Sequence, residues 1–193
     1  MGYHHGDLAR ALVDAGLEVT RSDGPDALTI REVTRRTGVT PNAAYRHFPD
    51  RRALLRAVSV VIEERMAAVM TDFSSVPSPR ARLRTIGLAY IGFAVAEPGW
   101  FAVTFFGEEV PSPETVAAAP PYRALTDALD CMVHAGELAP DALPAAAWAC
   151  WSAVHGFAEL ALHGPLHHVE RAQLWDYAER TVDAVIAGIT ATR

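Results

Sequence analysis

Residues 28–55 of the chain are LTIREVTRRTGVTPNAAYRHFPDRRALL, and their caps and turns predict two short helices in quick succession. The first opens with a capping box, in which the Thr29 hydroxyl accepts from the Glu32 amide and the Glu32 side chain reaches back to the Thr29 amide. Gly38 ends this helix, because glycine adopts the left-handed conformation at little cost. Thr40 caps the second helix, whose first position is a proline. Two short helices joined in this way predict a helix-turn-helix.

The charge of the chain is unevenly distributed around this stretch. Residues 28–56 hold seven Arg and two acidic residues, a net charge of +5, whereas residues 57–193 hold eight Arg and sixteen acidic residues, a net charge of −8. The whole chain of 193 residues has a net charge of −6 and contains no Lys. A small basic block on an acidic body predicts one face that binds a polyanion. The acidic remainder argues against an architectural protein that binds DNA over its whole surface.

The second helix has the side chains that a reader of the major groove needs. In its leading turn, Asn42 can reach an adenine edge while Pro41 and Ala43 touch thymine methyl groups. Tyr45 and His47 lie further along and are predicted to donate to phosphates, as is Arg51 at the start of the following helix. The predicted DNA-binding residues are Thr29, Arg31, Thr40, Pro41, Asn42, Ala43, Tyr45, His47 and Arg51.

The stretch resembles the DNA-binding module of the TetR family of bacterial transcription regulators. The resemblance is dense over residues 3–60 and rests on the Gly38 turn and on the Tyr-Arg-His-Phe run at 45–48, in register after the capping box. Late in the chain, Trp151 and the His155-Gly156 pair resemble the Trp-x-x-x-His-Gly signature of one branch of that family. The resemblance implies a homodimer that binds a palindromic DNA operator, with two recognition helices about one DNA turn apart. It also implies a repressor that an unknown small-molecule effector releases.

Helical periodicity continues to the end of the chain, so the predicted fold class is all-α. The predicted helices span about 5–22, 29–38, 40–47, 50–73, 80–96, 98–107, 121–135, 142–163 and 168–190. We expect a helix-turn-helix DNA-binding domain at 1–56 and a ligand-binding and dimerisation domain at 74–193. The helix at 50–73 connects the two.

Two groups of residues in the C-terminal part suggest a ligand pocket and a dimer interface. The candidate ligand-binding residues are Trp100, Phe101, Phe105, Trp148, Trp151 and His155. A helical protein of this length also needs large side chains for its core, so packing is the alternative role for each of them. The candidate dimer residues, which predict a four-helix bundle formed with a second copy, are Ala149, Ala153, Gly156, Leu160, Ala178, Thr181 and Val185.

Other classes of function have weaker support in the sequence. His163 and His167 have the spacing of a helical metal site, but Gly164 and Pro165 between them break the helix, so a metal-responsive sensor is only an alternative. The chain lacks the HExxH, P-loop, GxGxxG and GxSxG motifs. We therefore predict no catalytic residue, metal site or cofactor, with a small helical enzyme as the remaining alternative.

The expected compartment follows from the cysteines and from the hydropathy pattern. Cys131 and Cys150 form no CxxC motif, and both are predicted to be small buried residues in a reducing cytosol. The N-terminus has neither the basic region nor the apolar core of a signal peptide. The longest uncharged stretch, 142–158, is just short of a membrane span. These features predict a cytoplasmic protein with no membrane partner.

Overall fold

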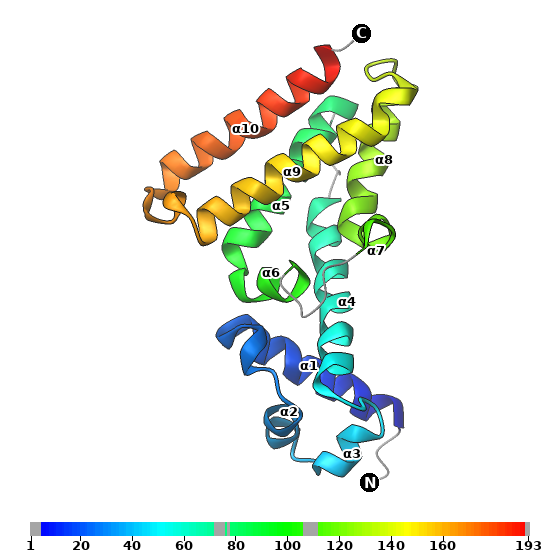
Figure 1. Cartoon of the computed structure of the whole chain (residues 1–193), viewed down its shortest axis with the longest axis vertical. Coiled ribbons are helices and arrows are strands. Elements are labelled where there is room, and N and C mark those ends of the chain that lie inside the picture. The colour runs from blue at the N-terminus through cyan, green and yellow to red at the C-terminus, as the bar shows by residue number, and fades with distance from the viewer. Residues whose placement is uncertain (1–4, 72–75, 77, 106–111, 192–193) are drawn as a thin grey trace. The chain divides into compact units, whose positions relative to one another are not determined.

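The structure, a computed structural model, describes residues 5–71, 76, 78–105 and 112–191, and every regular element within these ranges is a helix (Figure 1). The all-α prediction is therefore confirmed for this part of the chain. The chain divides into two compact units. We call Met1–Glu64 together with Glu97–Val110 the N-terminal unit, and Arg65–Ala96 together with Pro111–Arg193 the C-terminal unit.

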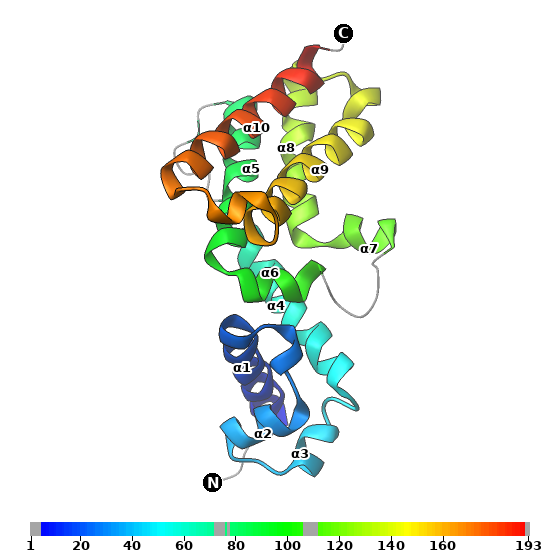
Figure 2. The same ribbon diagram turned by 60° about the vertical axis from the view of Figure 1, so that its left-hand side comes forward.

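The elements of each unit are visible in Figures 1 and 2. The N-terminal unit contains α1 (His5–Asp23), the 3-10 turn η1 (Pro25–Ala27), α2 (Ile30–Thr37), α3 (Pro41–Tyr45), most of α4 (Arg51–Met70) and α6 (Pro98–Phe105). The C-terminal unit contains the end of α4, α5 (Pro79–Ala96), α7 (Pro113–Ala118), α8 (Pro120–His134), η2 (Pro140–Ala142), α9 (Leu143–Leu162), η3 (Pro165–His168) and α10 (Arg171–Ala191).

The predicted helices agree with these bounds to within a few residues, with one omission. The predicted end of the connecting helix at 73 and the end of the 98–107 helix lie outside the described residues. The short helix α7 was missed, because the prolines around it were interpreted only as a break. Ser112 caps α7 by accepting from the Thr115 amide, and proline occupies its first position, where no N–H partner is needed.

The N-terminal unit has its core where α1, α2 and the start of α4 meet. Leu12, Leu28, Val33 and Leu54 are completely buried there. Gly24 has a φ of 77° and separates α1 from η1. Glycine adopts this positive φ, here with a ψ of 179°, without a steric penalty, and beyond the turn α2 packs against α1.

Residues 97–105 join this unit through a close contact between α6 and the end of α1. A Cβ atom added to Gly99 would lie 2.2 Å from the carbonyl oxygen of Thr20, so only glycine fits at this position without movement of the backbone. Residues 97–105 follow the part of α4 that packs on α1 by more than thirty residues. Because of this separation, the sequence pattern does not show that they belong to the N-terminal unit.

The residue after Gly99 strengthens the same contact. The Trp100 indole N–H donates to the carbonyl oxygen of Leu17 at 2.9 Å, and the ring is buried. The Arg21 guanidinium lies 5.0 Å from the centre of that ring and donates through two nitrogens to the Glu97 carboxylate. A cation over an indole face, held by a bidentate carboxylate, is a favourable arrangement.

The C-terminal unit is built from four helices, α5, α8, α9 and α10, which pack against one another around a mainly apolar core. On its surface, Arg84 of α5 donates to Asp183 at 2.7 Å and to Glu179 at 2.8 Å, both on α10. Cys150 is buried as predicted, but Cys131 is half-buried, and both are free thiols. No single helix in the described ranges is long and apolar enough to cross a membrane; α5 and α6 meet the length and composition test only as a bent pair.

The Gly99 contact generates a stability prediction. We expect Gly99→Ala to lower the free energy of unfolding by about 1–3 kcal/mol, because the methyl group would force the α1 backbone and α6 apart. The matched control is Gly92→Ala, where the added Cβ meets only the Trp175 ring at 3.4 Å, an ordinary contact. Replacing a helical glycine there should leave stability unchanged or raise it by up to about 1 kcal/mol. Urea denaturation followed by circular dichroism measures both, and equal stability of the two variants would contradict the contact.

Candidate functional site

The turn between α2 and α3 has the geometry that the sequence predicts. Gly38 has φ 70° and ψ 23°, in the left-handed region that other residues rarely adopt. Its N–H and that of Val39 both donate to the Thr34 carbonyl, which closes the end of α2. The turn therefore holds α3 in a defined direction relative to α2.

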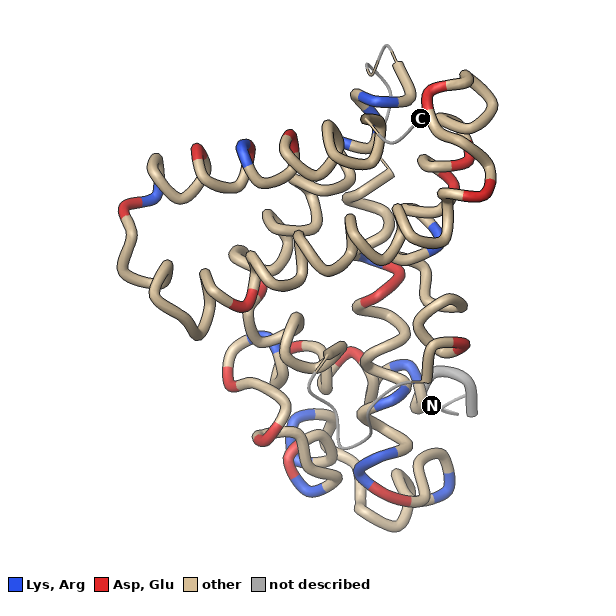
Figure 3. Tube along the Cα trace, turned by 45° about the horizontal axis from the view of Figure 1, so that its top comes forward, with Lys and Arg blue, Asp and Glu red and all other residues tan. Residues whose placement is uncertain are grey.

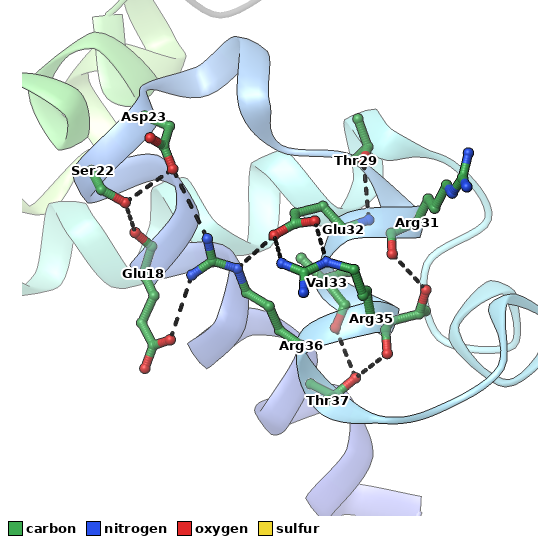
Figure 4. A network of polar contacts seen from close by, with 11 residues as sticks. Glu18, Ser22, Asp23, Thr29, Arg31, Glu32, Val33, Arg35, Arg36 and Thr37 are labelled. Carbon is green, nitrogen blue, oxygen red and sulfur yellow. Dashed lines mark hydrogen bonds and ion pairs between the residues drawn. The ribbon is translucent and has the colours of Figure 1, made fainter.

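The start of α2 confirms one half of the predicted capping box and corrects the other. The Thr29 hydroxyl accepts from the Glu32 amide at 3.0 Å, but the Glu32 carboxylate accepts from Arg35 at 2.7 and 2.9 Å and from Arg36 at 2.8 Å (Figure 4). Hydrogen bonds from Arg35 and then Arg36 lower the pKa of Glu32 to about 2. Two carboxylates of α1 also lie 3.9 Å from Arg36. Part of the basic block is thus neutralised within the unit, which a count of charges along the sequence does not reveal.

The short helix α3 presents its leading turn and its last residue to solvent. Thr40 caps it by accepting from the Ala43 amide at 3.3 Å. Pro41 and Asn42, two of the predicted base readers, are exposed. Ala44, on the opposite face, is completely buried and anchors α3 on the unit. This arrangement offers the leading turn to a groove while the helix remains packed from behind.

The predicted phosphate contacts differ in how available they are. The Tyr45 ring is 51% exposed, although tyrosine is usually more buried than this, so its hydroxyl can donate to an external acceptor. Arg31 is also exposed, while His47 and Ala43 are half-buried. Figure 3 colours the arginines blue and the acidic residues red along the trace. Arg46 of the same block is also exposed.

Arg51 has a structural role that the sequence analysis did not anticipate. Its Nε donates to the Leu28 carbonyl and its Nη2 to the Pro25 carbonyl, both at 2.7 Å. The side chain is half-buried and ties the start of α4 to the loop that precedes α2. A phosphate contact by Arg51 stays a prediction. Spacing along the chain could not reveal these acceptors, because they are backbone groups more than twenty residues away.

The C-terminal unit contains a cavity of about 20 Å³ in the middle of its helical core. It is lined by Met70, Leu83, Ile86, Gly87, Tyr90, Leu125, Cys150, Trp151, Val154, Val182, Val185 and Ile186. Of the candidate ligand-binding residues, Trp151 lines it directly, and His155 is linked to its wall through Tyr90, whose hydroxyl lies 2.9 Å from His155 Nδ1. Trp148 is 45% exposed and packs on Tyr122, with ring centres 5.6 Å apart.

The other three candidate ligand-binding residues do not line this cavity. Trp100 and Phe101 are buried in the N-terminal unit, and Phe105 packs on Phe101 with ring centres 4.8 Å apart. Trp100 is occupied by the contact with α1 described above. All three are engaged in packing within the N-terminal unit, which was the alternative role, and their part in ligand binding stays a prediction.

The candidate dimer residues separate into an exposed group and a buried group. On α9, Ala149 and Leu160 are exposed, and Ala153 and Gly156 are half-buried. On α10, Thr181 is half-buried, but Ala178 is completely buried and Val185 lines the cavity. Ala178 faces into its own protomer, so its assignment to a dimer surface is wrong, whereas Val185 is half-buried and its part in the interface stays a prediction. Periodicity identified the apolar stripe of α10 but not which neighbour covers it.

The described residues contain no group of three or more His, Cys, Asp or Glu side chains that could hold a metal ion. The site that the fold does build is an exposed, capped helix after a left-handed glycine turn, on a unit rich in arginine. This is the architecture of a helix-turn-helix DNA-binding protein.

Comparison with known families and structures agrees with this class. Residues 12–58 match the family described as bacterial regulatory proteins, tetR family, and residues 83–185 match the tetracyclin repressor-like C-terminal domain. The chain belongs to the TetR family of transcriptional regulators and is a DNA-binding regulator. No curated protein matches it.

Solved structures from several bacteria share the fold over nearly the whole chain. A protein of unknown function from Rhodococcus sp. RHA1 is 26% identical, with a TM-score of 0.80 over 98% of this chain and 99% of its own. A tetR-family regulatory protein from Rhodococcus RHA1 is 24% identical, with a TM-score of 0.63 over 92% of this chain and 96% of its own. A TetR variant from Acinetobacter baumannii AYE, in complex with minocycline, is 19% identical, with a TM-score of 0.69 over 100% and 99% of the two chains.

The two roles of arginine in the N-terminal unit can be separated experimentally. We expect Arg51→Gln to lower the free energy of unfolding without DNA by about 1–3 kcal/mol, because it removes charge-assisted hydrogen bonds to half-buried carbonyl groups. The matched variant is Arg31→Gln, at an exposed position, which should change stability by less than about 0.5 kcal/mol. Arg31→Gln should instead reduce the slope of log affinity against log salt by about 1. If the Arg51→Gln protein were as stable as the wild type, Arg51 would have no structural role.

The exposed hydroxyl of Tyr45 carries a second prediction. Tyr45→Phe should weaken binding to all duplex sequences about equally, by roughly fivefold, because a phosphate contact carries no sequence information. Tyr122→Phe, in the C-terminal unit, is the control and should leave DNA affinity unchanged. Fluorescence anisotropy on several unrelated duplexes measures the effect. If Tyr45→Phe changed only the preferred sequence, the residue would be a base reader instead.

Proposed function

We propose that the chain is a one-component transcriptional repressor that binds a palindromic operator as a homodimer and is released from it by a small-molecule effector. In this proposal residues 1–56 read the operator, and residues 74–193 bind the effector and dimerise. The helix at 50–73 connects these two domains. The protein acts in the cytoplasm and catalyses no reaction. The Trp151 to Gly156 signature belongs to the effector and dimer region.

The observation that carries the proposal is the geometry of α3 on the N-terminal unit. The Gly38 turn directs the helix, the buried Ala44 anchors it, and Pro41 and Asn42 remain exposed at its leading turn. A groove reader needs this combination of a fixed helix and free side chains. We propose Pro41, Asn42 and Ala43 as base contacts, and Thr29, Arg31, Thr40, Tyr45 and His47 as phosphate contacts.

An exposed surface on α9 and α10 supports the homodimer. Leu160 is 46% exposed, although leucine is normally buried, and it shares a face of α9 with Ala149, Ala153 and Gly156. A Cβ atom added to Gly156 or to Gly188 of α10 would meet nothing within 4 Å, so packing inside the protomer does not require either glycine. A helical glycine costs about 1 kcal/mol relative to alanine, which close packing of a second copy would offset. We propose that this face, with Thr181, forms the dimer interface.

The proposed release mechanism uses the continuity of α4. Met70 at the end of α4 lines the cavity, while Arg51 at its start is bonded to the loop before α2. An effector that enlarges the cavity displaces Met70 and shifts the population toward a conformer in which α4 is tilted. Moving that equilibrium from 1:99 to 99:1 requires about 5.5 kcal/mol of preference for one conformer.

The experiment that tests the proposed function is selection of bound sequences from a random duplex library by the purified full-length protein. We expect a palindrome with half-sites about one DNA turn apart, because a two-fold dimer presents two copies of α3. Enrichment of a single non-palindromic site would contradict the homodimer. Salt-sensitive binding with no enriched sequence would contradict a sequence-specific regulator.

The dimer face has its own test. Gly156→Leu should convert the dimer to a monomer in size-exclusion chromatography with light scattering, because a leucine prevents the close approach of a second α9. Its helical content should not change, since the open space in the protomer accommodates the side chain. Ala117→Leu on α7 is the control, because it adds the same side chain at an exposed position on another helix. A Gly156→Leu protein that stayed dimeric would place the interface elsewhere.

A further inference from the structure

The cavity of the C-terminal unit has a mainly apolar wall with few polar atoms. Nine of its twelve lining residues are aliphatic or glycine, and the polar atoms on the others are the Tyr90 hydroxyl, the Cys150 thiol and the Trp151 indole nitrogen. None of the described residues that line it carries a charge. A volume of about 20 Å³ is room for roughly one water molecule, so any larger occupant must push the walls apart.

We infer that the effector is an uncharged, mainly apolar and flat molecule with one hydrogen-bonding group, and that the Tyr90 hydroxyl is the residue that recognises this group. The inference rests on the proposed function, because it names the chemical class of ligand for the proposed effector site. It assigns a specificity role to Tyr90, which was not among the candidate ligand-binding residues.

The preference for a flat ligand follows from the aromatic part of the wall. Tyr90 and Trp151 meet edge to face, with ring centres 5.2 Å apart and planes at 67°. His155 lies nearly parallel to Trp151 at 11°, with ring centres 6.3 Å apart, and does not itself line the cavity. Rings held in this way offer a fixed aromatic surface, against which another ring packs in an offset or edge-on geometry.

The recognition of a polar group follows from the hydrogen bond between Tyr90 and His155. Tyr90 is 1% exposed, and its hydroxyl lies 2.9 Å from His155 Nδ1. If the tyrosine donates to Nδ1, its oxygen can still accept from a ligand; if Nδ1–H donates, the hydroxyl proton is available to a ligand carbonyl. A change of the His155 tautomer therefore lets the Tyr90 hydroxyl bind either a hydroxyl or a carbonyl group of a ligand.

The exclusion of ions follows from burial. Desolvation raises the pKa of Tyr90 well above its usual value and lowers the pKa of His155, so both groups are neutral at pH 7. The Glu159 carboxylate acts on both groups through its charge, but it does not line the cavity, and its Oε2 accepts from His163 at 3.1 Å. An anionic or cationic ligand would thus be buried without a charged partner in the wall, which costs far more than burying a neutral polar group.

Four probes that share one phenyl ring test this inference on the full-length protein: toluene, benzyl alcohol, benzoate and benzylammonium. Dissociation constants come from the rise in melting temperature at increasing probe concentration. We expect benzyl alcohol to bind about fivefold more tightly than toluene, the effect of one hydrogen bond. Benzoate and benzylammonium should bind at least tenfold more weakly than toluene. Binding of either ion as tightly as benzyl alcohol, or no stabilisation by toluene and benzyl alcohol, would overturn the inference.

Two variants identify the residue that recognises the hydroxyl. Tyr90→Phe should remove the preference for benzyl alcohol over toluene, whereas His155→Leu should retain it, because the tyrosine hydroxyl is then left to the ligand. Tyr122→Phe, which packs on Trp151 but does not line the cavity, is the matched control and should behave as wild type. A preference that survives Tyr90→Phe and disappears in His155→Leu would assign recognition to the histidine and overturn the role of Tyr90.

The test of the ligand class and the test of the proposed function can fail independently of each other. The wild-type probe series decides the charge class without any variant, so it does not depend on how a variant folds. Failure of all probes together with an enriched palindrome would refute the ligand class and leave the DNA-binding repressor intact. Selective binding of benzyl alcohol without any enriched sequence would support the ligand class and refute the regulator.

Discussion

The contact of Gly99 with the carbonyl of Thr20 determines how the chain is shared between its two units. Because position 99 has no side chain, α6 can begin directly against the end of α1, and the buried Trp100 ring then bonds to the same helix. The chain consequently leaves the C-terminal unit after α5 and contributes residues 97–105 to the N-terminal unit. Two of the segments that connect the units, α4 and the junction after α5, are therefore continuous with helices that line the cavity through Met70 and Tyr90. The proposed coupling between effector and DNA needs this double connection.

The N-terminal unit shows how a basic surface is made rigid. Arginine both builds the unit and supplies charge for DNA: Arg35 and Arg36 are paired with Glu32, and Arg51 is bonded to two backbone carbonyls. These interactions hold α2 and the start of α4 in place around the short α3. Five residues of helix cannot maintain their own conformation in water, so α3 depends on the Gly38 turn, the Thr40 cap and the buried Ala44. The exposed side chains are thus presented by a framework that is formed before DNA arrives.

The two candidate sites have opposite physical character, which suits a molecule that exchanges one ligand for another. The candidate DNA-facing surface is exposed, polar and carried by short elements, whereas the cavity is mainly apolar and lies among helices of fifteen residues or more. Its one buried polar pair, Tyr90 and His155, is mutually hydrogen-bonded, so it costs little while no ligand is present. A site of this kind binds through shape and one hydrogen bond, and the proposed response is a change in the packing of helices.

The sequence by itself determined the local features, because caps, turns and helical periodicity depend on residues within a few positions of one another. The all-α fold, the Gly38 turn, the Thr29 and Thr40 caps and the exposed turn at Pro41 and Asn42 belong to this group. Tertiary structure alone decided which distant groups meet: Trp100 with α1, Arg51 with the Leu28 carbonyl, and Ala178 with its own protomer. Each of these partners is chosen by packing and by the acceptors that folding leaves within reach. Periodicity marks a buried stripe but contains no information about what covers it.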